Sequence, residues 1–161
     1  MSTFLRAIEF LSLSLWLGSD VFLSFVVAPG AFRILAPNRD HAGAIVGYSL
    51  NVMHLGGIFC GCVLLLARLT RTKTFASLAT PAALCVVLMI ALTAISQYTV
   101  SARMAVLRVQ MGSIQATAAD SSLLAEFSRL HGISVSLESG VLLAGIAAMY
   151  LIVRELALKP S

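Results

Sequence analysis

An apolar run near the N-terminus, LWLGSDVFLSFVVAPG (residues 15–30), contains a single charged residue, Asp20, close to its centre. The run continues an apolar segment that begins near residue 8 and is rich in leucine, valine and phenylalanine. A helix needs about 20 apolar residues to cross the ~30 Å hydrocarbon layer of a bilayer. The stretch therefore predicts a membrane span near residues 8–31, with a carboxylate midway along it.

The whole chain has the composition of an integral membrane protein. Of its 161 residues, 59% are hydrophobic and 11% are charged, whereas soluble domains contain roughly 25% charged residues. Three further apolar runs predict helical spans near residues 46–68, 76–99 and 130–153. We expect residues 1–161 to form one domain, an all-α integral membrane protein built as an antiparallel four-helix bundle.

Basic residues between and beside the spans predict the orientation of the bundle, and they argue against a nucleic-acid partner. One side carries six of them, in a short turn and near the termini: Arg6, Arg68, Arg71, Lys73, Arg154 and Lys159. The other side carries five: Arg33, Arg39, Arg103, Arg108 and Arg129. Because the turn at residues 68–73 is short and dense, we expect a multi-pass protein of the inner (cell) membrane with both termini in the cytoplasm.

Asp20 belongs to a polar stripe on the first span. Ser12, Trp16, Asp20 and Ser24 are spaced four residues apart, so they share one face of a helix. A charged carboxylate in the middle of a bilayer costs ~2.5–3.5 kcal/mol even on the lenient insertion scale. We therefore expect Asp20 to face the bundle interior, protonated, paired or hydrated, with Glu138 or His54 on another helix as its leading partner.

Each of the other spans carries polar residues at helical spacing: Asn51 and His54, then Thr93 and Gln97, then His131, Ser134 and Glu138. Glu138 lies ~10 Å deeper along its helix than His131, close to the expected depth of Asp20. The pattern predicts a cavity open to the extracytoplasmic side, with histidines at its mouth and two carboxylates at its floor. The predicted ligand-binding residues are Asp20, His54, Gln97, His131 and Glu138.

These residues favour a protein that binds or conducts a cation, a proton or a small cationic ligand. Imidazole and carboxylate groups together suit a first-row divalent metal better than a soft one, although the sequence names no metal. An alternative is an accessory subunit of a larger membrane complex, whose polar residues contact partner helices or lipids. A third interpretation is a b-type haem held between His54 and His131 on facing helices.

No catalytic residues are predicted, and we do not expect an enzyme. The sequence contains no Ser/His/Asp order, no Gly-rich phosphate loop and no His-x-x-x-His pair. The expected partners are the lipid bilayer and, in the alternative interpretation, other membrane subunits. Gly57 and Gly61, together with a ridge of small residues on the last span, predict close helix packing within one bundle rather than a dimer face.

The order of several short motifs also resembles a known family. The first half carries Trp16-Leu-Gly18, Phe25-Val-Val-Ala28-Pro29, Phe32-Arg33, Ala42-Gly43 and Gly47; the second carries Gln97-Tyr98, Arg103, Leu107-Arg108 and Phe127-Ser-Arg-Leu-His131 before Ser134. Together they resemble the "transmembrane protein 205"-like family, a domain-of-unknown-function family of small four-helix membrane proteins without an established activity.

The resemblance covers nearly the whole chain and implies structural roles for the residues that match it: Trp16, Gly18, Pro29, Arg103, His131 and Ser134. Three of the proposed cavity residues depart from the family's pattern, namely Asp20, His54 and Glu138. The resemblance therefore does not account for the two carboxylates predicted at the floor of the cavity.

Overall fold

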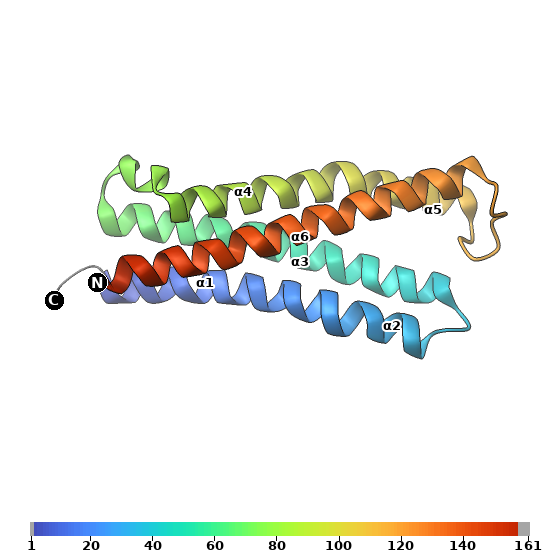
Figure 1. The fold of residues 1–161 in the computed structure, drawn as a ribbon, viewed down its shortest axis with the longest axis horizontal. Helices are drawn as coiled ribbons and strands as arrows, with labels where there is room; N and C mark the ends of the chain where they lie inside the picture. The colour runs from blue at the N-terminus through green and yellow to red at the C-terminus, as the bar shows by residue number, and fades with distance from the viewer. Residues whose placement is uncertain (1, 158–161) are drawn as a thin grey trace.

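The computed structural model describes residues 2–157 and consists of four long antiparallel helical rods (Figure 1). The first rod comprises α1 (Ser2–Phe22), the π-helical turn η1 (Leu23–Val27) and α2 (Ala28–Ile34). The second is α3 (Arg39–Thr72), and the third comprises α4 (Pro81–Ile95), the π-helical turn η3 (Ser96–Ser101) and α5 (Ala102–Met111). The fourth is α6 (Ser122–Ala157). All four rods are long and apolar enough to cross a membrane, which confirms the expected all-α membrane bundle.

The helices extend beyond the apolar segments of the sequence, because the rods contain 31 to 36 residues each. The expected span at 76–99 begins too early: residues Phe75–Ala79 form a separate 3-10 turn, η2, and the helix starts at Pro81. Thr80 is extended, with φ −69° and ψ 149°, because a proline disfavours helical geometry in the residue before it.

The tightly packed core lies in the half of the bundle nearer the two termini. Trp16 of α1 is only 1% exposed, and its indole lies flat against Gly57 and Gly61 of α3. A Cβ at Gly61 would come within 2.7 Å of Trp16 Cζ3, and one at Gly57 would overlap the indole ring. Trp16 of the same bundle therefore fills the space that Gly57 and Gly61 leave on the surface of α3.

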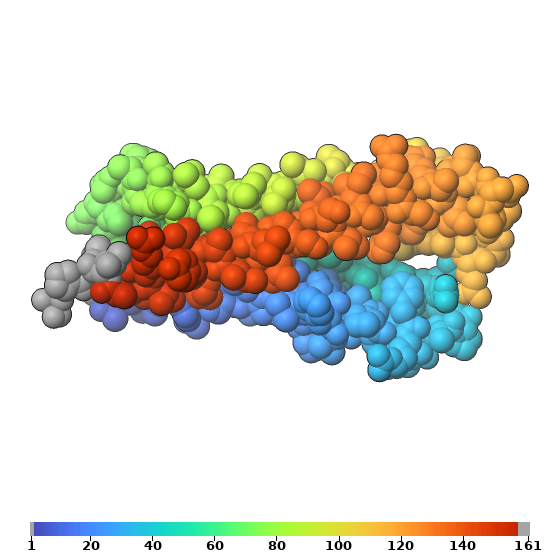
Figure 2. Space-filling model, viewed as in Figure 1, coloured from blue at the N-terminus to red at the C-terminus, as the bar shows by residue number. Residues whose placement is uncertain are grey.

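The other half of the bundle is hollow. Beyond η1 and η3, α2 packs on α3 and α5 packs on α6, while these two pairs diverge (Figure 1). Across residues 2–157, no Cα of η1 or α2 comes within 8 Å of a Cα of α6. Figure 2 shows the resulting hollow between the blue residues of α2 and the orange residues of α5 and α6. Since π-helical turns are a recognised cause of helix bending, η1 and η3 supply a local reason for the divergence.

Candidate ligand cavity

The hollow half encloses a cavity of about 1520 Å³. Its lining begins at Asp20 on the first rod and at Gln97 on the third, and from there runs toward the 112–121 loop. Glu138 contributes from α6 at the same inner end, and Asn51 from α3. We call this inner end, formed by Asp20, Asn51, Gln97 and Glu138, the floor of the cavity. Most other lining residues are apolar.

His54 lies directly beneath the floor and is fully buried. Its Nε2 lies 2.6 Å from Glu138 Oε1, and its Nδ1 lies 2.8 Å from Gln97 Oε1. The amide nitrogen of Gln97 in turn donates to Asn51 Oδ1. Because Gln97 Oε1 is an acceptor, Nδ1 of His54 carries a hydrogen and donates it. A further proton lies between His54 and Glu138, so the two residues form either an ion pair or a neutral hydrogen-bonded pair.

Two carboxyl oxygens at the floor lack a hydrogen-bond partner among residues 2–157. Glu138 accepts from Ser96 Oγ at 3.0 Å through Oε1, but its Oε2 is buried and unpartnered. Asp20 is 1% exposed and accepts from Ser24 Oγ at 3.3 Å through Oδ1, whereas its Oδ2 is buried and unpartnered. Buried polar atoms normally find a partner. The floor therefore offers two unused acceptors that suit a cationic or hydrogen-bond-donating group.

Asp20 faces the bundle interior, as expected. Its hydrogen bond goes to Ser24 on the same rod, and it interacts electrostatically with Glu138 and His54. Contact with either residue, directly or through water, stays a prediction. The expected place of His54 is wrong. His54 does not lie at the cavity mouth. Its two hydrogen bonds hold the fully buried ring one layer below Glu138 and Gln97.

The b-type haem interpretation does not fit this geometry. His131 is exposed on the cavity wall, while both ring nitrogens of His54 are engaged by Gln97 and Glu138. An axial haem ligand needs a ring nitrogen free to bind iron, and His54 has none in this arrangement. In the part of the chain that the structure describes, no group of three or more His, Cys, Asp or Glu residues is placed to hold a metal ion.

The residues singled out by the family resemblance occupy different environments. Pro29 lies at the start of α2 and lines the cavity, as does the buried Ser134 on α6. Gly18 faces open space. Arg103 lies outside the cavity, where it donates to Glu126 at 2.8 Å. Of these four residues, only Pro29 and Ser134 are therefore placed to touch a bound molecule.

Arg108 is the most unusual residue of the cavity wall. It starts from α5, and its guanidinium lies against Gly43 and Gly47 of α3; a Cβ at Gly47 would come within 3.2 Å of Nη1. The same group lies 5.8 Å from the centre of the Phe127 ring. Nε of Arg108 is buried without a hydrogen-bond partner, and no carboxylate of residues 2–157 lies within 4.0 Å of the group. Arg108 thus reaches across the cavity without a close ion pair, and it interacts with the Asp40 carboxylate only at longer range.

The 112–121 loop lines the end of the cavity opposite the floor and is fastened to the start of α3. The carboxylate of Asp40 accepts hydrogen bonds from the Ser113 hydroxyl and from the backbone N–H of Ile114, the latter at 2.9 Å. Gln115 Oε1 also accepts from the backbone N–H of Arg39 at 3.0 Å. The loop is held across this end, and the cavity opens to the side between α2 and α6, which share no Cα pair within 8 Å (Figure 2).

Sequence reasoning missed the roles of Ser96 and Arg108. Four-residue spacing places Thr93 and Gln97 on one face, but it is Ser96, at the start of the π-helical turn, that donates to Glu138. The buried hydroxyl of Thr93 has no partner among the described residues. Arg108 near a helix end has the pattern of a headgroup or topology residue. The four-residue spacing of Gly43 and Gly47 is the signal in the sequence that fits a large side chain arriving from another helix.

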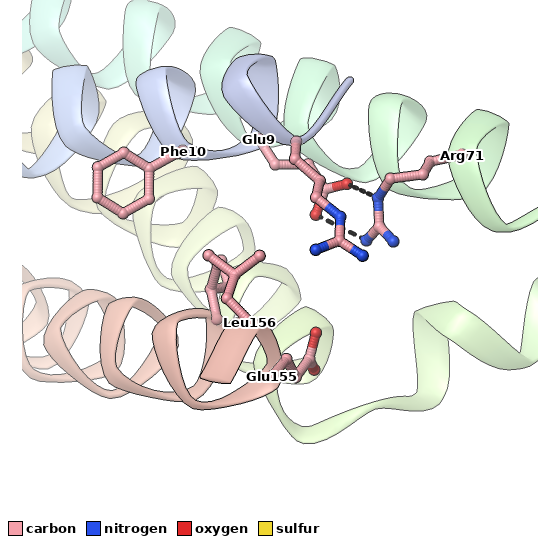
Figure 3. A pocket seen from close by; sticks show the side chains of 7 residues that line it. Glu9, Phe10, Arg71, Glu155 and Leu156 are labelled. Atoms are coloured by element: carbon pink, nitrogen blue, oxygen red, sulfur yellow. Dashed lines mark hydrogen bonds and ion pairs between the residues drawn. The ribbon is translucent and has the colours of Figure 1, made fainter. Parts of the chain in front are cut away.

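A second charged cluster closes the opposite end of the bundle, around a pocket of about 30 Å³ (Figure 3). Arg71 Nε donates to Glu9 Oε1 at 2.6 Å, as the dashed line in Figure 3 shows. The buried Arg68 donates to both oxygens of Glu155 at 2.7 Å and to Thr80 Oγ1 at 2.9 Å. Nη1 of Arg68 has no hydrogen-bond partner among the described residues, but it lies 3.7 Å from Glu9 Oε2. Together these charged groups fasten α1, α3, α6 and the start of α4, so we interpret the cluster as structural.

Comparisons with curated proteins and with solved structures give no match for this chain. A protein family does match: residues 11–113 fit the family described as "Domain of unknown function (DUF4149)". The match includes Asp20, His54, Gln97 and Arg108 and ends before α6, which supplies Glu138. Because it covers more than half of the 161 residues, the chain belongs to the DUF4149 family of domains of unknown function.

Proposed function

We propose that this protein is a non-catalytic membrane protein that binds a cationic small molecule within the bilayer, at the carboxyl floor of its cavity. The observation that carries the proposal is the pair of unpartnered, buried oxygens, Asp20 Oδ2 and Glu138 Oε2, at the inner end of the cavity. A positively charged group near them compensates two groups whose burial is otherwise costly.

The size and chemistry of the cavity favour an organic cation over a bare metal ion. A volume of about 1520 Å³ exceeds the ~300–1,000 Å³ typical of small-molecule pockets. The largely apolar wall suits a hydrophobic body, while Asp20 and Glu138 suit a charged head. His54 is engaged with Glu138, so the shared proton can lie on His54 and leave the Glu138 carboxylate ionised beside the cation. The net charge of that pair does not change, and the Asp20 carboxylate supplies the balancing charge.

Binding of tetraphenylphosphonium, a lipophilic cation, tests this function on the purified full chain in detergent. Asp20→Asn keeps the shape of the side chain and removes its charge. We expect it to weaken binding about tenfold or more, equivalent to ~1.4 kcal/mol. Equilibrium dialysis with radiolabelled cation measures the dissociation constant.

Glu126→Gln is the matched control. It removes a carboxylate that pairs with Arg103 at the surface, outside the cavity, and should leave binding unchanged. Equal binding by the wild type and Asp20→Asn, or no binding by the folded wild type, would contradict the proposed function. Gel filtration of each variant establishes that it is folded.

The proposal extends to the family and the membrane. The motifs described above support a relationship of this DUF4149 member to the "transmembrane protein 205"-like proteins, and the basic turn at residues 68–73 supports cytoplasmic termini in the inner membrane. Ala36 and Ala76 are both exposed and lie at opposite ends of the bundle.

Single cysteines at these two alanines test the orientation. In a chain whose three native cysteines are replaced by alanine, a membrane-impermeant maleimide added to intact cells should label the Ala36→Cys variant. The Ala76→Cys variant should react only after the membrane is permeabilised. The opposite labelling pattern would reverse the orientation.

A further inference from the structure

We propose that Arg108 binds the phosphate headgroup of an anionic membrane lipid, whose chains occupy the apolar part of the cavity and leave through the gap between α2 and α6. This site lies toward the loop end of the cavity, apart from the carboxyl floor. It does not depend on the proposed binding of a cation there.

The guanidinium of Arg108 has a donor that no group of the described residues accepts. Arg108 stretches from α5 to the Gly43 and Gly47 face of α3, where the missing side chains leave room for it. Its Nε is buried without a partner, and no carboxylate of the described residues pairs with the group. A buried N–H without an acceptor is costly. Its planar set of donors matches two oxygens of a phosphate.

One anion of the protein lies near Arg108, namely Asp40, which interacts with it electrostatically but forms no ion pair with it within 4.0 Å. Asp40 also lines this part of the cavity, but its oxygens accept from Ser113, Ile114 and Gln115 of the loop. The ring of Phe127 lies beside the guanidinium and holds it by a cation–π contact at 5.8 Å. Arg108 is thus held in position while its donors stay available.

The gap along the side of the bundle gives a ligand a path to Arg108. The 112–121 loop lies across the aqueous end, whereas η1 and α2 stay apart from α6 along the side of the bundle (Figure 2). All four rods are long and apolar enough to cross a membrane, so a gap along the side of the bundle opens toward lipid. Apolar residues from both borders line the cavity there: Phe25, Phe32, Leu124, Val135 and Leu142. A lipid reaches Arg108 along this path without leaving the membrane, which favours a lipid over free phosphate.

Lipid binding to the purified full chain tests the proposal. Dioleoyl phosphatidylglycerol and dioleoyl phosphatidylcholine are added to the protein in mild detergent, and native mass spectrometry counts the bound lipids. The wild type should prefer phosphatidylglycerol, and Arg108→Gln should weaken that binding about tenfold or more. Arg108→Lys keeps the charge and should retain part of the preference.

Arg103→Gln is the matched control, because Arg103 is on the same helix but pairs with Glu126 outside the cavity. It should bind phosphatidylglycerol as the wild type does. An equal loss in both variants would mean general attraction of lipid to the surface and would overturn the site. Equal binding of the two lipids by the wild type would overturn it too, as would displacement of phosphatidylglycerol by millimolar inorganic phosphate. Binding of tetraphenylphosphonium should persist in Arg108→Gln, so failure here is distinguishable from failure of the proposed cation site.

Discussion

Replacing Trp16 by alanine is expected to lower the free energy of unfolding by about 3–5 kcal/mol, the range for removing a large aromatic side chain from a packed core. The indole is 1% exposed and fills the space beside Gly57 and Gly61. In lipid, helices are held mainly by close packing, because burying apolar surface there gains little. Unfolding by sodium dodecyl sulfate in mixed micelles measures the change. Phe59→Ala is the control, since Phe59 is 69% exposed on α3 and should alter stability little.

The same contact is testable from its other side. A methyl group at Gly57 overlaps the indole, so Gly57→Ala alone should cost about 1–3 kcal/mol through overpacking. In the Trp16→Ala background that methyl group enters vacated space, and the double variant should be more stable than the sum of the single losses predicts. Strictly additive losses would show that the two residues do not pack together.

Much of the fold could be predicted from the sequence because membrane spans depend on length and hydropathy. Four apolar runs predicted four rods, and Asp20 was not enough to break the first of them. The ends of the helices were harder to predict. A helix continues past its apolar residues until a residue disfavours helical geometry. For example, α3 already begins at Arg39, before its apolar segment. Where a reason exists, at Thr80 before Pro81, the helix starts later than hydropathy suggests.

The candidate site was predictable only as far as helical spacing determines it. Four-residue spacing identified Asp20 as interior, and spacing on α6 brought Glu138 to a similar depth. The partners of His54 depend on the axial offset between α3, η3 and α6, which no single helix encodes. The π-helical turn at Ser96–Ser101 changes which residues of the third rod share a face. No pattern in the sequence predicts this turn.

The cavity and the inward position of Arg108 could not be predicted from the sequence either, because both depend on how the helices are arranged. A cavity is a property of how two helix pairs diverge, and the apolar residues that line it have the same composition as those facing lipid. Arg108, placed near the end of a span, resembles many arginines that interact with lipid headgroups from outside. Only the position of Gly43 and Gly47 on the facing helix shows that this one turns inward.

Replacing Arg68 by methionine is expected to lower the free energy of unfolding by about 1.5–3 kcal/mol, the range for hydrogen bonds to charged groups, because the buried guanidinium loses its bonds to the partly exposed Glu155 carboxylate and to neighbouring oxygens. Arg68 is 3% exposed and donates to Glu155, to Thr80 and, at 3.2 Å, to the carbonyl oxygen of Ser77. It thereby joins α3 to α6 and to the turn before α4. Methionine has a similar length, so the loss reports charge and hydrogen bonds more than an empty space.

Unfolding of two further variants by sodium dodecyl sulfate determines whether the loss comes from the ion pair. Arg103→Met removes an arginine of the exposed pair with Glu126 and should change stability little, because solvent screens such pairs. A second change, Glu155→Met, should recover part of the stability lost in Arg68→Met, since a pair of apolar side chains often replaces a buried ion pair at small cost. If the double variant were less stable than Arg68→Met alone, Glu155 would be stabilising the bundle through contacts other than Arg68. The stabilising role assigned to the Arg68–Glu155 ion pair would then be wrong.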